Sequence, residues 1–301
     1  MKKAYFITTF ILFLLTFVSL DSFAQEKVDF RINLDAGACF EVESAIISVS
    51  ENNMVKKESK NEVTTVVRYQ VVKKTSDFYR LNFMYTDFYS VATGIKEFTI
   101  DPKSADALNI FDGSTQVSMM MNKPFSADVS PKGKIYTVKE NKEIENEFKQ
   151  KTKNLSPELS SQISFMVNSF SGNEALVELI ESWASYIPDS VVDIGDSWTV
   201  RKDSALTRYT FVAETDSTYS IKGVGSKKTT VNNEIMGMSM TVNTEEEYTI
   251  AIEIDKHTFL PNIINRESDA LITGNMQNNP ALSNHQSKSK NILTLKINGC
   301  N

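Results

Sequence analysis

Alternation of apolar and polar residues with a period of two dominates this chain of 301 residues. Over residues 63–71 every second residue is β-branched or aromatic, and the same pattern returns over residues 79–85 after a polar turn. Such alternation is typical of antiparallel strands that bury one face. Because these runs are neighbours in sequence, we expect hairpins joined into a meander.

The second half of the chain repeats the pattern. Apolar residues alternate over residues 209–213, 236–242 and 248–254, a turn at residues 255–258 leads into a strand over 259–272, and residues 292–297 form the last strand. Gly223 and Gly225 predict a break, since glycine weakens a strand interior. The polar residues 274–290 predict a loop. The run of Glu245, Glu246 and Glu247 is interpreted as a solvated strand end.

A helical segment interrupts these strands. Residues 143–153 indicate a surface helix, and Ser156 followed by Pro157 predicts the start of a second one. Two apolar stripes follow at helical spacing. Their members are Leu159, Ile163, Met166, Val167 and Phe170, then Leu176, Leu179, Ile180, Trp183 and Ile187. Amphipathic helices must cover an apolar surface, and the sheet is the surface available.

The predicted fold is therefore mainly β with a short helical insert. We expect an antiparallel, open or closed barrel-like sheet with two or three helices packed on it. The boundaries are a leader over 1–24, an N-terminal β part over 25–138, the helical insert over 139–187 and a C-terminal β part over 188–301. The N-terminal part ends in a hairpin of residues 125–129 and 134–138. Residues 25–301 are expected to form one composite domain.

The first residues resemble a secretory signal peptide. Lys2 and Lys3 precede an apolar run over residues 4–20, and Ser22 and Ala24 fit a cleavage site. An uncleaved anchor is the alternative, but the run is short for a membrane span. Cleavage after Ala24 predicts an exported protein of the periplasm or cell surface of a bacterium, with no transmembrane span in the mature chain.

Charge and cysteine content narrow the functional classes. The formal net charge is −6 and no basic cluster occurs, which argues against nucleic acid as a partner. A transmembrane barrel is disfavoured because the strands lack aromatic girdles. Cys39 and Cys300 are the two cysteines. In an oxidising compartment they are a disulfide candidate, with two unpaired thiols as the alternative.

One motif points to hydrolysis. Residues 191–197 resemble the nucleophile block of the Gly-Asp-Ser-Leu esterases, with Ser197 as the nucleophile. In that family the block lies near the mature N-terminus, whereas here it lies two thirds along the chain, Trp198 replaces the Leu, and Asp255 and His257 are spaced one residue too closely to match the family's base motif. We interpret the motif as a turn that leads into a strand, and we predict no catalytic residue.

Methionine-rich runs raise the question of copper. Residues 119–121 are three consecutive methionines, and Met236, Met238 and Met240 alternate; soft sulfur ligands select Cu(I). Methionine is also a flexible core residue, and this is the favoured interpretation. His257 and His285 are the two imidazoles and do not form a cluster. We predict neither a metal nor a cofactor.

Four short motifs are shared with a known family. They are residues 130–134 (Ser-Pro-Lys-Gly-Lys), residues 187–189 (Ile-Pro-Asp) with Val192, residues 195–198 (Gly-Asp-Ser-Trp), and Asp255 with Thr258. Together they resemble a family of exported bacterial proteins of unknown function, domain-of-unknown-function family 6263. The resemblance implies a β-rich envelope protein and transfers no catalytic residue.

These patterns favour a non-enzymatic exported protein that binds an apolar small molecule or lipid in a barrel-like cavity. The predicted cavity wall consists of Tyr79, Leu81, Phe83, Tyr85, Trp183, Met236, Met238 and Met240. The same residues are equally suited to fill a solid core. The alternative function is a structural or protein-interaction module of the cell envelope, and the third is an envelope hydrolase that uses Ser197.

Overall fold

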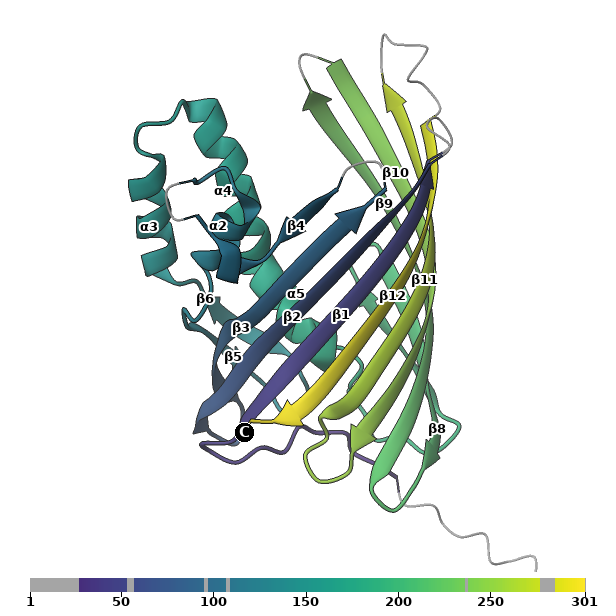
Figure 1. Cartoon of the computed structure of the whole chain (residues 1–301). Helices are drawn as coiled ribbons and strands as arrows, with labels where there is room; N and C mark the ends of the chain where they lie inside the picture. Colours follow the sequence, from purple (N-terminus) through teal and green to yellow (C-terminus); the bar gives the residue numbers. More distant parts are fainter. Residues whose placement is uncertain are drawn as a thin grey trace, which may run out of the picture.

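In the computed structural model, residues 27–52, 57–94, 97–106, 109–235, 238–276 and 285–300 are described. One antiparallel sheet of twelve strands curls around the helices and does not close (Figure 1). The strand order is β6-β5-β3-β2-β1-β12-β11-β10-β9-β8-β7, with β4 paired to β3. This architecture confirms the predicted fold class, in its open form.

Strands lie on both sides of the helical insert, as the sequence pattern indicates, and two further short helices lie between β4 and β5. The strands are β1 Cys39–Asn52, β2 Lys57–Lys74, β3 Tyr79–Thr93, β4 Phe98–Ile100, β5 Phe125–Val129, β6 Ile135–Lys139, β7 Ser197–Lys202, β8 Ala205–Glu214, β9 Thr218–Ile235, β10 Met238–Asp255, β11 Pro261–Met276 and β12 His285–Gly299. The helices are η1 Pro102–Ser104, α2 Gly113–Ser118, α3 Lys142–Thr152, α4 Pro157–Ser171 and α5 Asn173–Ala184.

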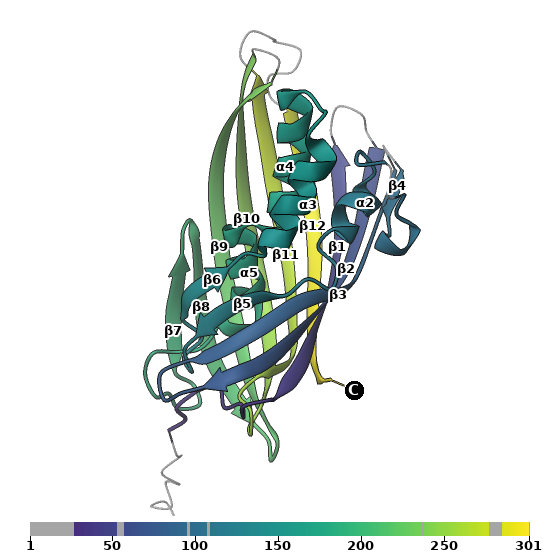
Figure 2. The ribbon, with the colours of Figure 1, turned by 90° about the vertical axis from the view of Figure 1, so that its left-hand side faces the viewer.

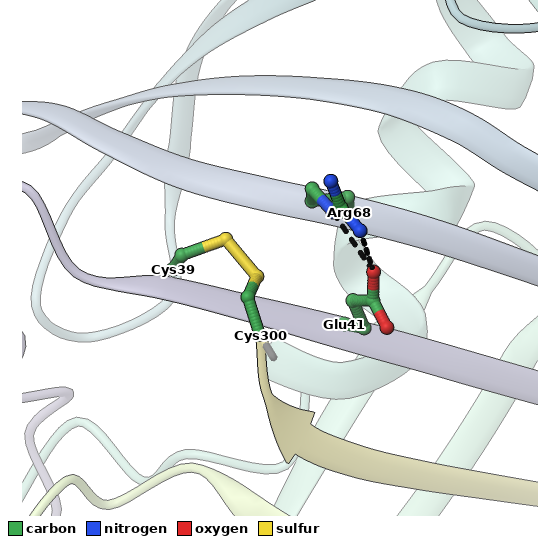
Figure 3. The surroundings of a disulfide bond; sticks show 4 residues. All are labelled: Cys39, Glu41, Arg68 and Cys300. Atoms are coloured by element: carbon green, nitrogen blue, oxygen red, sulfur yellow. Dashed lines mark hydrogen bonds and ion pairs between the residues drawn. A yellow bond between two sulfur atoms is a disulfide. The ribbon is translucent and has the colours of Figure 1, made fainter.

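The first and last strands lie at the centre of the sheet. Antiparallel pairing of β1 with β12, which begins at Phe40 and Gly299, joins the two β halves. Next to this pair, Cys39 and Cys300 form a disulfide with a Cα–Cα distance of 5.5 Å, beside the ion pair of Glu41 with Arg68 (Figure 3). The predicted disulfide is confirmed. Because it links residues 261 positions apart, it stabilises the fold by about 4 kcal/mol through the unfolded chain.

Polar side chains cap the starts of two helices of the insert. The Asn141 side chain caps α3 by accepting from the Glu143 amide, and the Ser156 hydroxyl caps α4 by accepting from the Leu159 amide. The stripe of α5, formed by Leu176, Ile180 and Trp183, is buried. Figure 2 shows the helices on the side of the sheet toward which it curls, and this side is called the helix face. The opposite side is called the open face.

A ladder of aromatic rings forms the centre of the core. Phe40, Tyr69, Phe83 and Phe125 come from four adjacent strands, with ring centroids 5.0, 5.4 and 5.6 Å apart. Trp183 on α5 meets Phe40 and Tyr69 edge-on at 5.4 and 5.6 Å. Offset and edge-to-face contacts at these distances add to the energy of burial. The helical insert is therefore fastened to the middle of the sheet.

The lower end of the sheet, which holds Cys39, Cys300 and the turns after β2, β8 and β10, is closed by an extended segment. Residues 28–34 have the alternation of a strand, but apart from the bridge of Val28 with Val192 they pair with no strand of the described chain. Their apolar members Phe30, Ile32 and Leu34 are all buried instead. The segment packs across the end of the core, and this burial explains its pattern.

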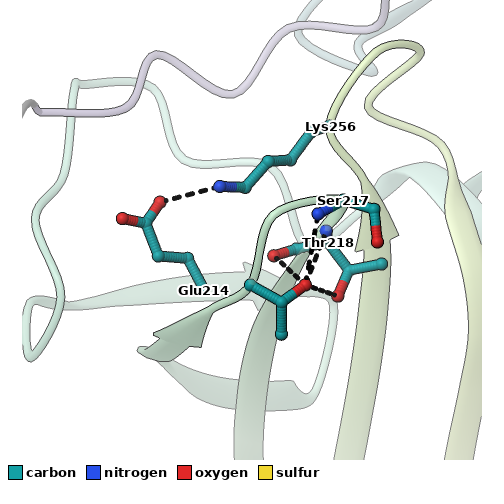
Figure 4. Close-up of polar contacts among 5 residues, drawn as sticks. Glu214, Ser217, Thr218 and Lys256 are labelled. Carbon is teal, nitrogen blue, oxygen red and sulfur yellow. Dashed lines mark hydrogen bonds and ion pairs between the residues drawn. The ribbon is translucent and has the colours of Figure 1, made fainter.

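Two lower turns are also tied to each other. Lys256 in the β10–β11 turn bonds Glu214 at the end of β8 at 3.1 Å, and the backbone amides of Ser217 and Thr218 donate to Thr215 (Figure 4). Asp255 accepts from the amides of His257 and Thr258, which confirms the predicted turn there. The lower end is thus fixed by turn chemistry as well as by packing.

Three local expectations were wrong. Gly223 and Gly225 do not break a strand, because β9 runs through them and neighbouring tyrosine rings cover the bare positions. The expected loop over residues 274–290 contains the end of β11 and the start of β12, where Gly274 pairs with His285. The three glutamates lie in the middle of β10, where Lys228 and Arg266 pair with two of them.

Candidate ligand-binding cleft

A cleft of about 340 Å³ lies on the helix face, between α5 and strands β7 to β12. Its floor consists of four aliphatic side chains, Ile250, Ile252, Ile264 and Leu293. Ile252 and Ile264 are buried, and the other two are partly buried against the core. Antiparallel register brings them together, since Ile252 lies opposite Ile264. The floor offers an apolar surface that no helix covers completely.

Three tyrosines form the walls of this cleft. Tyr186 follows α5, Tyr209 lies on β8 and Tyr248 lies on β10. A Cβ atom at Gly223 would come within 3.0 Å of the Tyr209 ring, and one at Gly225 within 2.5 Å of the Tyr248 ring. The two glycines therefore make room for the rings to lean across β9. This close approach is why a strand here contains Gly-x-Gly.

Two side chains hold Tyr248 in place. Its hydroxyl shares a hydrogen bond of 2.7 Å with the Thr207 hydroxyl, and the Arg266 guanidinium lies over its ring at 4.0 Å. Arg266 in turn donates to Glu246 at 2.8 Å. Stacking on the aromatic face and pairing with a carboxylate both fix the guanidinium plane. One wall of the cleft is thus rigid and polar.

The hydroxyls of Tyr186 and Tyr209 remain neutral. Burial raises the pKa of Tyr209, and the nearby Tyr248 adds to this effect. Burial also raises the pKa of Tyr186, whose hydroxyl donates to the Phe259 carbonyl at 2.9 Å. Desolvation disfavours the charged phenolate. These groups can therefore donate and accept hydrogen bonds but do not act as bases near neutral pH.

Charged residues surround the mouth of the cleft. Glu181 on α5 forms an ion pair with Lys202 on β7, which ties the helix to an edge strand. Glu178, Asp203 and Lys227 complete the rim. The site combines an apolar floor, walls that carry tyrosine hydroxyls and a charged rim. This combination is usual for small-molecule sites in proteins.

The predicted cavity wall lies elsewhere in the core. Tyr79, Leu81, Phe83 and Tyr85 share one face of β3, and like Trp183 they are at most 6% exposed. They do not line this cleft. Tyr79 donates to the Ile32 carbonyl at 2.8 Å, and Tyr85, whose pKa burial raises to about 12, donates to the Phe170 carbonyl at 3.0 Å. Contact of these residues with a ligand stays a prediction.

Some of the methionines considered as ligands lie within the described residues, and others do not. Met236 lies outside the described residues, and Met238 and Met240 belong to the start of β10, with side chains outside the description. Met119 and Met120 are buried in the core. No group of three His, Cys, Asp or Glu side chains that could hold a metal ion occurs among the described residues.

Ser197 lies at the start of edge strand β7 and is exposed. Its hydroxyl shares a hydrogen bond with Thr210 at 2.8 Å, and no imidazole or carboxylate bonds to it within the described ranges. Asp196 belongs to the turn, where it accepts from the Asp193 amide, and the Trp198 indole donates to the Tyr186 carbonyl. The motif forms the predicted turn and strand start, next to the cleft wall.

Sequence reasoning missed the residues that build the cleft. Tyr186, Tyr209 and Tyr248 are far apart in sequence, and Arg266 lies on a further strand. The one available signal was the Gly-x-Gly pair within a strand pattern, because such glycines mark close approach by another group. Which group approaches depends on strand register, which the sequence alone does not reveal.

None of the helices in the described parts of the chain combines the length and apolar character needed to cross a bilayer. No curated protein matches the chain. Solved structures align over most of its length but at low similarity. An outer membrane channel from Pseudomonas putida F1 has 7% identity and a TM-score of 0.22, covering 91% of this chain and 99% of the channel. The β domain of the Bordetella autotransporter BrkA has 5% identity and a TM-score of 0.24, covering 87% and 99%.

DynF from the dynemicin biosynthesis pathway of Micromonospora chersina has 4% identity and a TM-score of 0.22, covering 91% of this chain and 85% of that one. Scores at this level support no argument about function. The profile of a family of unknown function, DUF6263, matches residues 76–261, which is more than half of the chain. The match extends from the turn between β2 and β3 to the start of β11. The protein whose core and cleft are described above therefore belongs to the DUF6263 family.

Proposed function

We propose that this protein is an exported envelope protein that binds an apolar or lipid-like ligand in the cleft between α5 and the sheet. The observation that supports this proposal is the aliphatic floor of Ile250, Ile252, Ile264 and Leu293 beneath three tyrosines. A volume of about 340 Å³ falls within the range of about 300 to 1,000 Å³ that is common for ligand pockets.

The disulfide supports the exported location. Disulfides form and persist in oxidising compartments and are rare in the cytosol of most organisms. Cys39 and Cys300 are bonded, and the leader-like pattern over residues 1–24 agrees with passage out of the cytoplasm. We therefore place the mature protein in the periplasm or at the cell surface.

The cleft suggests how such a ligand lies. Its apolar part packs on the aliphatic floor, and its polar end lies at the rim near Lys202, Asp203 and Lys227. The hydroxyls of Tyr209 and Tyr248 provide hydrogen bonds between the floor and the rim. A ligand with an apolar body and one polar end satisfies all three surfaces, whereas a wholly charged ligand would leave the floor unused.

The test fills the cleft and compares it with a matched surface change. Ile250→Trp places an indole over the floor, and Ala251→Trp places one on the open face of the same strand, where Ala251 is exposed. We expect Ile250→Trp to weaken binding of a fluorescent fatty-acid probe at least about tenfold, with Ala251→Trp unchanged. Equal binding by both variants and the native protein would refute the cleft as the site.

The alternative function, a protein-interaction module of the envelope, is supported by the open face. Two adjoining hollows of about 790 and 700 Å³ lie there, and their shared lining includes Ser226, Glu247, Asp269 and Lys290. Their mixed charges suit a polar protein surface rather than a lipid. Chemical cross-linking in intact cells through Lys288 or Lys290 would capture such a partner.

A further inference from the structure

Strand β9 extends well beyond its neighbour β8. The pairing of β8 with β9 runs from Tyr219 to Lys227, where Ala205 is the last partner. The remaining residues, 228–235, pair only with β10 within the described part of the chain. Figure 1 shows β9 and β10 rising far above β8. Residues 228–235 are called the free β9 edge, and they span about 26 Å.

The sheet protects its other edges better. Edge strand β7 has six residues and β6 has five, and β6 also contacts α5. Short length and cover by a helix are the usual ways to prevent edge pairing. The free β9 edge has eight residues, contains no proline, and includes Thr229, Thr230 and Val231, which favour strands. Val231 is 47% exposed. A long uncovered edge of this kind is a template for another strand.

The sequence of this edge is complementary to itself. If two copies pair antiparallel about a two-fold axis at Val231, position 228 lies opposite position 234, 229 opposite 233, and 230 opposite 232. Position 228, a lysine that pairs with Glu245 of its own chain, then lies opposite position 234, a glutamate, in both halves. The remaining opposed positions combine a threonine with an asparagine. Opposite charges and hydrogen-bonding pairs across strands are stabilising, whereas like charges are not. A two-fold interface requires this kind of self-complementarity.

We propose that a second copy of this chain pairs with the free β9 edge, so that two sheets become one continuous sheet across the dimer. Eight strand residues bury less surface than a standard interface, so the dimer is expected to dissociate in the micromolar range. This inference does not depend on the proposed ligand, because residues 228–235 do not line the cleft.

Charge exchange tests the register. The mass of the mature protein in solution is measured by light scattering or sedimentation over about 1 μM to 1 mM, the range that brackets the expected dissociation constant. We expect Lys228→Glu and Glu234→Lys each to weaken the dimer at least tenfold, and the double exchange to restore it. Lys222→Glu is the control, since Lys222 is exposed on the same strand where Thr210 of β8 pairs with it.

A cysteine at the two-fold axis provides an independent readout. Opposed residues in antiparallel strands lie close enough for a disulfide, and the native cysteines are already bonded. We expect Val231→Cys to cross-link into a dimer on mild oxidation, and Val224→Cys, 58% exposed beside β8, to stay monomeric. The proposal is overturned if the protein is monomeric at every concentration, or if both charge reversals leave the dissociation constant of the dimer unchanged. The free β9 edge would then pair with another polypeptide or with none.

Discussion

The two ends of the same strands differ in what they do. At the lower end of β1, Phe40 and Val42 are 3% and 4% exposed on the helix face, while Ser48 and Ser50 occupy that face near the upper end. The upper strands are joined by side-chain hydrogen bonds, such as Ser50 with Ser59 at 2.7 Å and Thr241 with Asn232 at 2.8 Å.

The contrast between the lower and upper ends shows that only part of each strand contributes to the core. The lower ends hold the aromatic ladder, the buried segment 28–34 and the disulfide, whereas the upper ends of β2 and β12 are mainly polar over residues 57–62 and 285–291. The cleft lies where one region gives way to the other, since Ile252 and Ile264 belong to the apolar part and Lys227 and Arg266 to the polar part. A ligand with an apolar and a polar end fits this boundary.

The largest expected effect comes from the aromatic ladder. Phe40→Ala removes a ring that stacks on Tyr69 and meets Trp183, and we expect a loss of about 3 to 5 kcal/mol in the free energy of unfolding. Val49→Ala, higher on the same strand and only partly buried, should cost about 1 kcal/mol or less. Chemical denaturation measures both, and equal losses would remove the distinction between the two ends.

The disulfide is the next largest contribution to the lower end. Cys39→Ser combined with Cys300→Ser should lower the free energy of unfolding by about 2 to 4 kcal/mol, because the unfolded chain regains the freedom of a very long loop. The reduced native protein should unfold at the same denaturant concentration as the double variant. If reduction leaves the native midpoint unchanged, the bond does not stabilise the lower end.

Gly225→Ala tests whether the Tyr248 ring lies against β9 in the cleft, where the apolar and polar parts of the strands meet. Its new Cβ would meet the Tyr248 ring at 2.5 Å and the Leu206 carbonyl at 2.7 Å, so either the ring or β9 must move, at a cost of about 1 to 3 kcal/mol. Probe binding should weaken with it. Gly299→Ala is the control, since no atom lies within 4 Å of its added Cβ. A stable Gly225→Ala variant with native binding would contradict the proposed tyrosine placement.

The smallest expected effect is electrostatic. Arg80 donates to both Asp128 oxygens at 2.7 and 2.8 Å, and these bonds lower the pKa of Asp128. A carboxyl group whose pKa is lower in the folded than in the unfolded chain stabilises the fold at pH values above its unfolded pKa of about 4. This stabilisation is lost as the pH falls through the pKa of the folded state. Asp128→Asn should therefore reduce the loss in the free energy of unfolding at acidic pH by less than about 1 kcal/mol. The effect is small because Arg80 is 44% exposed and solvent screens the ion pair.

The lower end could be predicted from the sequence and the upper end only in part. Alternation around Tyr69 and Phe83, the stripe that contains Trp183 and the two cysteines all identified core elements, because burial of one face leaves a periodic signal. Residues 285–290 gave no such signal, since a strand that is polar on both faces has no apolar alternation. The cleft was not predicted because Tyr186, Tyr209 and Tyr248 meet only through register and the glycines between them.

Native mass spectrometry of the mature protein, purified from an envelope fraction without detergent exchange, tests the central claim most directly. We expect a bound species of lipid-like mass on the native protein and on Ala251→Trp. We expect it to be absent from Ile250→Trp, whose indole would cover the floor beside Ile252. A native protein that carries no ligand and takes up none from added fatty acid or phospholipid, or an Ile250→Trp variant that binds as the native protein does, would contradict it.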